Sequence, residues 1–362
     1  MKVKPGHLLF VSIPLAVIAH QLQWNQTAVF LLAALGTIPA ASLMGQATEE
    51  LAARSGPGIG GLLNVTFGNA PELIIALFAL QAGLLEVVKA SLAGSIISNV
   101  LLVLGASMLA GGLSKHSRNG SQQFSRITAS SQSGMLMLAT VALLMPAIHS
   151  MVTGTGIPKV GQVQSPSSDM QTLTLIICGV LLLVYLAGLF FALVTHSKLF
   201  NPEEGLSSDG WTAGKAALVL ALAGGLVALM SEILVGSIEK TAHQAGLSQF
   251  FIGAVVVALV GNAAEHWVAV AAARKQQMDL AVNIAIGSAA QIALFVVPVL
   301  FLASWVIGPG PMNLVFNGYE LAALSLAAIV SAGVSAKGES TWFEGLQMVA
   351  VYLVVAACFA IA

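Results

Sequence analysis

Charged side chains are scarce in this sequence. Asp, Glu, Lys and Arg make up 8% of its 362 residues, whereas soluble domains carry about 25%. Hydrophobic residues make up 57%. A chain of this composition cannot cover a water-soluble surface, so the sequence predicts an integral membrane protein. The net charge of −1 supplies no basic surface, and nucleic acid is not expected as a partner.

Cysteine is also rare, and one common metal motif is missing. Cys178 and Cys358 both stand in apolar runs, which is typical of small packing residues and not of a disulfide framework. An intramembrane metalloprotease would need HExxH or a similar ligand set. Here Glu265-His266 stands without a second histidine. The sequence therefore predicts a protein that is not an enzyme and has no resident cofactor.

Long apolar runs take the place of these features. A helix needs about 20 mostly apolar residues to cross a bilayer. By this measure the sequence predicts an all-α polytopic membrane protein with eleven transmembrane helices. They cover residues 7–23, 27–48, 59–80, 88–112, 132–149, 172–195, 213–238, 249–273, 279–303, 314–334 and 343–361. Lys2 and Lys4 before the first run are also typical of a signal peptide, but no small-residue cleavage site follows. We expect the first helix to be retained.

Lysine and arginine are unevenly distributed over the predicted loops. Eleven fall on the side of the N-terminus, and three, Lys89, Lys159 and Lys240, fall on the opposite side. The positive-inside rule then places the N-terminus in the cytoplasm and the C-terminus outside. The short termini lead us to expect a prokaryotic plasma-membrane protein.

A repeated motif lies inside two of the predicted spans. Gly68-Asn69-Ala70-Pro71-Glu72 matches Gly261-Asn262-Ala263-Ala264-Glu265, and residues 59–104 align with 252–297 at a constant offset of 193. The motifs lie in spans three and eight, which cross the membrane in opposite directions. Inverted duplications of this kind place a substrate site near the membrane midplane, where the two halves meet.

The repeat also divides the chain. Residues 1–26 would form an additional N-terminal helix, and 27–196 the first inverted repeat, spans 2–6. A short cytoplasmic linker, 197–212, would lead to the second repeat, 213–362, which holds spans 7–11.

The duplicated carboxylates need compensation within the membrane. A charged side chain at the bilayer centre costs about 2.5–3.5 kcal/mol on insertion scales, so Glu72 and Glu265 must be protonated, paired or bound to a cation. Asn69 and Asn262 precede them by three residues and share their helix faces. Carboxylate and amide oxygens are the ligands that Ca²⁺ prefers. One Ca²⁺ or two protons would neutralise the two carboxylates, which is the requirement for exchange. The alternative is a purely structural pair of buried carboxyl groups, which the duplication disfavours.

Polar residues on the following spans extend this candidate site. Ser95 and Ser98 correspond to Ser288 and Gln291 in the repeat, and each pair lies three residues apart on one helix face. They are predicted to be cation ligands or to orient ligands. Ordinary hydrogen bonding between membrane helices is the alternative.

Three further ionisable residues are candidates for proton transfer. His266 has no counterpart, because Leu73 occupies the matching position. It is expected either to tune Glu265, to relay protons or simply to pack. Glu49 and Glu232 lie in the first span of each half and are candidate secondary proton sites, or else interfacial carboxylates.

These motifs resemble those of the cation/calcium antiporter superfamily, and within it the Ca²⁺/H⁺ exchangers called CAX. The stretch "TEELAARSGPGIGGLLNVTFGNAPELIIALFAL" is similar to the first conserved block, and "MSEILVGSIE", "VALVGNAAEH" and "GSAAQIALFVVPVL" are similar to blocks of the second half. The resemblance covers about residues 40–361. The histidine after the second motif glutamate and the GS-x-x-Q pattern resemble CAX proteins more than sodium/calcium exchangers.

The resemblance implies an eleven-helix fold whose first helix lies outside a ten-helix core. It implies that Glu72 and Glu265 are the central cation ligands and that Glu49 and Glu232 are paired acidic positions. It further implies that the remaining polar candidates line the site: Asn69, Asn262, Ser95, Ser98, Ser288, Gln291 and His266. The acidic stretch that the family often carries between its halves is reduced here to residues 201–210, so a regulatory cation site in that loop is not expected.

The predicted function is therefore Ca²⁺/H⁺ antiport by alternating access, in which proton entry exports cytosolic Ca²⁺. The partners would be Ca²⁺, protons and the lipid bilayer. An antiporter for Na⁺ or Mn²⁺ is the main alternative. A passive cation channel is a weaker one, because channels usually repeat an element in parallel around a pore. The sequence defines no oligomeric state.

Overall fold

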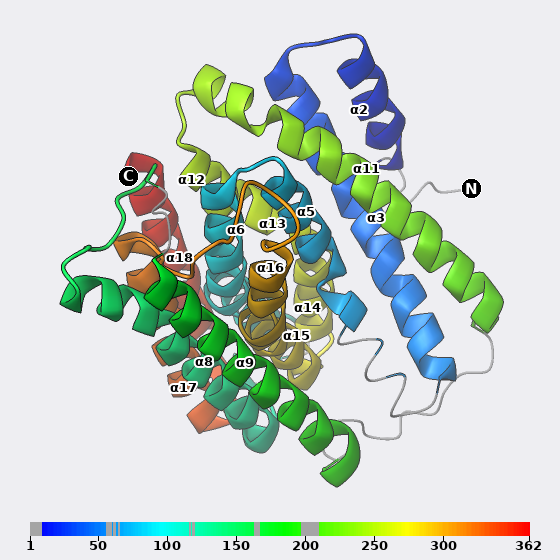
Figure 1. The fold of residues 1–362 in the computed structure, drawn as a ribbon. Coiled ribbons are helices and arrows are strands. Elements are labelled where there is room, and N and C mark those ends of the chain that lie inside the picture. The colour runs from blue at the N-terminus through cyan, green and yellow to red at the C-terminus, as the bar shows by residue number, and fades with distance from the viewer. Residues whose placement is uncertain are drawn as a thin grey trace.

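The computed structural model describes residues 9–55, 60, 63, 66–115, 117, 120–162, 167–196 and 210–362. Helices dominate these residues (Figure 1). The α-helices are α2 (Ser12–Gln21), α3 (Gln26–Arg54), α5 (Ala70–Gln81), α6 (Leu85–Ile97), α7 (Leu104–Gly112), α8 (Arg126–Val152), α9 (Ser168–Phe190), α11 (Ala213–Ala245), α12 (Gln249–Phe251), α13 (Ala258–Gly261), α14 (Ala263–Arg274), α15 (Met278–Gln291), α16 (Val297–Ala303), α17 (Gly318–Lys337) and α18 (Trp342–Ile361).

Wider and tighter helical turns join several of these elements. A 3₁₀ turn, η1 (Leu9–Val11), precedes α2. Four π-helical segments continue neighbouring α-helices without a break: η2 (Ser98–Val103), η3 (Phe191–Thr195), η4 (Ile252–Val257) and η5 (Ile292–Val296). Segments η2 and η5 occupy corresponding positions of the sequence repeat, and π-turns of this kind are frequent at functional sites.

Within the described residues, eight helices are long and apolar enough to cross a membrane. They are 26–54, 85–112, 126–152, 168–195, 213–245, 278–303, 318–337 and 342–361. The pair 249–261 and 263–274, which is bent by 58°, is a broken span or a re-entrant loop. The two other predicted spans correspond to shorter apolar helices within the described residues, Leu9–Gln21 and Ala70–Gln81. The polytopic helical fold is confirmed, and the total of eleven spans remains a prediction.

Two long helices lie beside the main bundle. Helices α3 and α11 run side by side on one flank of the molecule, with α2 against them (Figure 1). Hydrogen bonds fasten both ends of the pair. The Thr27 hydroxyl donates to Gln244 Oε1 over 2.9 Å, and the Trp211 backbone N–H donates to Glu50 Oε2 over 2.9 Å. The start of each helix therefore meets the end of the other, so they are antiparallel.

The centre of the bundle is formed by α6–η2–α7 and α15–η5–α16. Every residue of α6 from Val87 to Ile97 is buried. The outer helices expose apolar side chains instead, including Leu183 on α9 and Val354 on α18. Apolar exposure at this level is expected for helices that face lipid.

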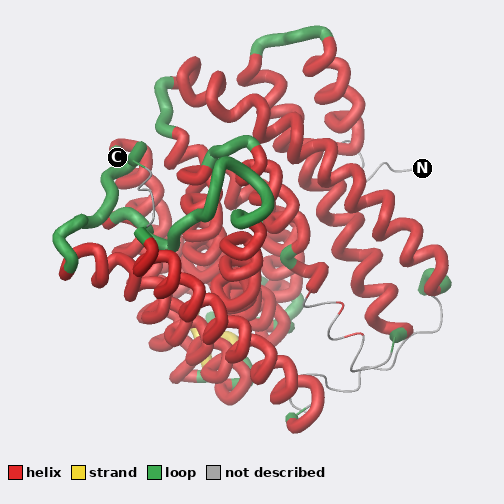
Figure 2. The backbone as a smooth tube through the Cα atoms, viewed as in Figure 1, coloured by secondary structure: helices red, strands yellow, loops and turns green. Residues whose placement is uncertain are grey.

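Two differences from the predicted elements have local causes. The predicted span 314–334 begins too early, because Asn317 and Glu320 form a reciprocal capping box that starts α17 at Gly318. The loop after α7 also contains a short strand, β1 (Ser121–Gln123), which pairs antiparallel with β2 (Glu339–Thr341) before α18 (Figure 2). Three polar residues show no apolar alternation, so sequence patterning could not detect this strand.

Several predictions fall outside the described residues. These include Lys2 and Lys4, most of the predicted linker 197–212, and the part of the first conserved block at 56–59.

Candidate cation site

The GNAxE motif interrupts a helix in both halves of the chain. Asn69 precedes α5 with φ −97° and ψ 20°, and Asn262 separates α13 from α14 with φ −89° and ψ 2°. The prediction of continuous helices over 59–80 and 249–273 is therefore wrong at these two asparagines. Pro71 favours a helix start in the first half, since it lacks a backbone N–H. In the second half, Asn262 Nδ2 donates to the Ala258 carbonyl over 2.9 Å and competes with helical bonding.

Each interruption places a carboxylate in the first turn of a new helix. Glu72 lies in the first turn of α5 and Glu265 in the first turn of α14. Helix N-termini carry partial positive charge and unsatisfied N–H groups. The broken helices therefore favour negative charge at the positions where the sequence supplies it.

The asparagines bond across the two halves. Asn69 Nδ2 donates to Gln291 Oε1 over 2.7 Å, and the Ser288 hydroxyl donates to Asn69 Oδ1 over 2.7 Å. Reciprocally, Asn262 Nδ2 donates to Ser95 Oγ over 2.9 Å. The structure thus joins five of the predicted site residues into one network at the interface of the repeats.

Asn99 connects the two sides of this network. Its Nδ2 donates to Asn262 Oδ1 over 3.1 Å and to Ser288 Oγ over 3.3 Å, and its side chain is completely buried. Asn99 stands next to Ser98 in the sequence, and this position makes it a plausible ligand or orienting residue. Ser98, predicted as a ligand, instead donates to the Ser95 carbonyl of its own helix over 3.2 Å.

Glu72 lies beside a small cavity between the two halves of the chain. Glu72 is 7% exposed, and both of its oxygens lack a hydrogen-bond partner among the described residues. It lines a cavity of about 10 Å³ together with Ser91, Ser95 and Gly261, which is room for about one water molecule. A Cβ added at Gly261 would lie 3.4 Å from Glu72 Oε1, and one added at Gly68 would lie 3.9 Å from Glu265 Oε1, so each carboxylate approaches the motif of the other half. Two like charges in such a place require protons or a cation.

Close helix contacts surround this cavity. A Cβ added at Gly94 would lie 1.9 Å from the Ala254 carbonyl oxygen, and one at Gly261 would lie 3.3 Å from Glu72 Cγ. Gly94 thus allows α6 to touch the backbone of η4, and Gly261 leaves room for the glutamate. No group of three or more His, Cys, Asp or Glu residues gathers in the described part of the chain. A bound cation would therefore rely on two carboxylates with amide and hydroxyl oxygens.

The predicted proton-transfer residues lie outside this network. His266 follows Glu265 on α14, and its Nε2 atom has no hydrogen-bond partner among the described residues. Glu49 on α3 and Glu232 on α11 are both exposed. Glu232 shares the outward face of α11 with Leu222 and Leu229, which are also exposed. The structure brings neither acid into contact with the central carboxylates, and their part in proton transfer remains a prediction.

The chain is similar to known exchangers over almost its whole length. The profile of the family described as sodium/calcium exchanger protein matches residues 25–194 and 215–360. The chain belongs to this family. Members of the sodium/calcium exchanger family with similar sequences include a "Ca(2+)/H(+) antiporter" of Aphanothece halophytica, 40% identical over 98% of this chain and 95% of that protein. The "Ca(2+)/H(+) antiporter ChaA" of Bacillus subtilis is 41% identical over 97% of each chain.

Solved structures of the exchanger family share the fold. The structure titled "Structure of native YfkE" superposes with a TM-score of 0.83 at 38% identity, covering 99% of this chain and 100% of that chain. The "H+/Ca2+ Exchanger CAX" structure superposes with a TM-score of 0.72 at 15% identity, covering 98% of this chain and 91% of that chain, and supports the fold alone.

Proposed function

We propose that this exchanger-family protein is a Ca²⁺/H⁺ antiporter. One observation carries the proposal. Glu72 and Glu265 each lie near the motif glycine of the opposite half, and three of their four oxygens lack hydrogen-bond partners among the described residues. A site of this kind is stable when it holds one divalent cation or two protons, and unstable when it is empty and ionised. The names of the similar proteins agree with this chemistry.

Exchange follows from these alternative loads. Ca²⁺ would be held by the two carboxylates and by oxygens of Asn69, Asn262 and the neighbouring serines, while protons would neutralise the same carboxylates. Because the empty site is too costly to reorient, the return step would require protons. Alternating access then couples proton entry to Ca²⁺ export, with no resident cofactor and no covalent step.

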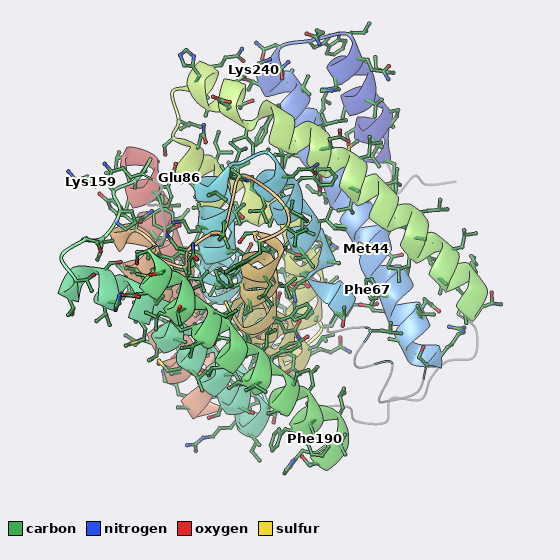
Figure 3. The ribbon with its side chains drawn as sticks, viewed as in Figure 1. Met44, Phe67, Glu86, Lys159, Phe190 and Lys240 are labelled. Carbon is green, nitrogen blue, oxygen red and sulfur yellow. The ribbon has the colours of Figure 1, made fainter. Side chains whose placement is uncertain are left out.

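We place the N-terminus in the cytoplasm and read 27–196 and 213–362 as inverted repeats. Three lysines are assigned to the external side. Two of them, Lys159 and Lys240, lie at the same end of the molecule, which supports this topology (Figure 3). Phe190, near the predicted cytoplasmic end of α9, lies at the opposite end (Figure 3).

The test is Ca²⁺ uptake by proteoliposomes under an imposed pH gradient. Vesicles with an acidic interior should accumulate Ca²⁺ against the Ca²⁺ gradient. Collapse of the pH gradient by a protonophore, added together with a permeant ion, should release the accumulated Ca²⁺. Uptake that only dissipates a Ca²⁺ gradient would indicate a channel. Parallel assays with Mn²⁺ and Na⁺ would separate Ca²⁺ exchange from the alternative antiport activities.

A further inference from the structure

A lysine is buried at one end of the central helix α6. Lys89 is 5% exposed, and its Nζ donates to the carbonyl of Val315 over 2.9 Å. Val315 belongs to the extended segment 311–317 that precedes α17. The two residues are 226 positions apart, so this bond ties the first half of the chain to the second.

Two carboxylates act on the buried ammonium group from beyond ion-pair distance. Glu320, 2% exposed on the first turn of α17, accepts a 2.7 Å hydrogen bond from the Asn317 backbone N–H and interacts electrostatically with Lys89. Glu86, three residues before Lys89, accepts a 2.5 Å hydrogen bond from the Gly161 backbone N–H and also interacts with Lys89. We call the Lys89–Val315 bond, together with Glu320 and Glu86, the tether. It joins α6, the start of α17 and the loop that follows α8, at the end of the molecule where Figure 3 labels Glu86 and Lys159.

The tether has no counterpart in the second repeat. The constant offset of 193 places Val282 where the first repeat has Lys89. Val282 is 2% exposed and packs in an apolar cluster on α15. Inverted repeats alone would give the two ends of the transporter equivalent closures. A charged tether at one end makes that closure different from the other.

The tethered helix also carries part of the cation site. Ser91 and Ser95 of α6 line the cavity beside Glu72. Ser95 is six residues beyond Lys89, about 9 Å along the helix axis. Because α6 is continuous between them, a displacement at Lys89 would move the serine face relative to Glu72.

We propose that Lys89 is a positioning residue of the exchange cycle. Its bond to Val315, supported by the charge of Glu320, holds this end of α6 closed over the Glu72 cavity, and its release accompanies opening at that end. The role of Lys89 in the exchange cycle rests on the proposed antiport function. The closure of α6 over the cavity can be measured without transport.

The experiment measures access to the cavity in purified protein. Ser91→Cys is introduced into a Cys178→Ala, Cys358→Ala background, and its modification by a hydrophilic maleimide is followed in detergent. Lys89→Met keeps an apolar stem but removes the charge and the donor.

This variant should speed modification of the cysteine at position 91 by about tenfold, because a charge-assisted bond that favours closure is lost. Lys159→Met makes the same change at an exposed lysine at the same end and should leave the rate unchanged. Lys89→Arg should stay within about twofold of the parent protein.

Equal rates for Lys89→Met and Lys159→Met would overturn the proposal, as would an Arg variant that is modified as fast as the Met variant. If Lys89→Met does not fold, Glu320→Gln replaces it, since glutamine keeps an acceptor for Asn317 but removes the charge. A rise of about threefold is then expected, and an unchanged rate contradicts the tether. Since modification does not depend on Ca²⁺ transport, failure of the antiport assay with a positive result here would refute the function and leave the closure standing.

Discussion

At the scale of single residues, the two central carboxylates are equivalent in sequence but not in surroundings. Glu265 has Ser288 within reach, and the Ser288 hydroxyl proton is also given to Asn69 Oδ1. A hydroxyl has one proton, so it cannot serve both acceptors at once. Glu72 has no such neighbour among the described residues. Binding of a cation at Glu265 would therefore affect the Asn69 network directly.

Removing either central charge should abolish exchange. Glu72→Gln or Glu265→Gln leaves one carboxylate, which cannot neutralise a divalent cation in a site of low dielectric. Proteoliposome uptake should fall to the protein-free background, while size-exclusion profiles stay normal. Glu344→Gln is the matched control, because Glu344 forms an exposed ion pair with Lys337 near a helix end, and its loss should be mild. A folded Glu72→Gln variant with near-normal uptake would refute the assignment.

The same two groups make binding depend on pH. If protons and Ca²⁺ compete for Glu72 and Glu265 as proposed, apparent Ca²⁺ affinity should fall as the pH falls. Where both carboxyl groups are protonated, displacement of two protons gives up to about a hundredfold change in affinity for each pH unit. Calorimetry in buffers of different ionisation enthalpy would measure the protons released. If Ca²⁺ affinity is independent of pH, or if Ca²⁺ binding releases no protons, direct competition is wrong. Glu49, Glu232 and His266 are then the next residues to test as the proton-coupling groups.

At the scale of elements, the sequence located the helices better than their interruptions. The apolar runs predicted the spans, because burial in lipid requires long helices. The motif repeat brought Asn69, Asn262 and Ser288 together correctly. It could not reveal that each asparagine ends a helix, since that depends on partners from the other half. Glu320 lies near the start of the predicted span 314–334, where an interfacial carboxylate would be expected, yet it is 2% exposed and forms the capping box with Asn317.

The contact between α6 and η4 allows a test at this scale. Gly94→Ala places a methyl group 1.9 Å from the Ala254 carbonyl oxygen, so the two helices must separate. Overpacking of this kind costs about 1–3 kcal/mol, and we expect the thermal unfolding midpoint in detergent to drop by a few degrees with loss of uptake. Gly134→Ala is the control, because nothing lies within 4 Å of its added Cβ. An unchanged midpoint for Gly94→Ala would mean that this contact is not tight in solution.

At the scale of the whole molecule, the distribution of lysine and arginine predicts which end faces the cytoplasm. Residues 113–130 should be cytoplasmic and 150–170 external. In a Cys178→Ala, Cys358→Ala background, Lys159→Cys should react with an impermeant thiol reagent added to intact cells, whereas Lys115→Cys should react only after permeabilisation. If Lys115→Cys reacts in intact cells and Lys159→Cys reacts only after permeabilisation, the proposed orientation is wrong and every span crosses the membrane in the opposite direction.

The π-helical segments have a consequence for how the molecule moves. Segment η2 begins at Ser98 and η5 begins directly after Gln291, which is the counterpart of Ser98 in the repeat, so each central helix carries a surplus residue in one turn beside the site. A surplus residue can pass to the adjacent turn by exchanging one backbone hydrogen bond for its neighbour, which rotates the intervening side chains without melting the helix. Each half thus contains a π-helical turn at which the helix can rotate locally. If access alternates as proposed, rotation at these turns would change the walls of the site while the helices stay whole.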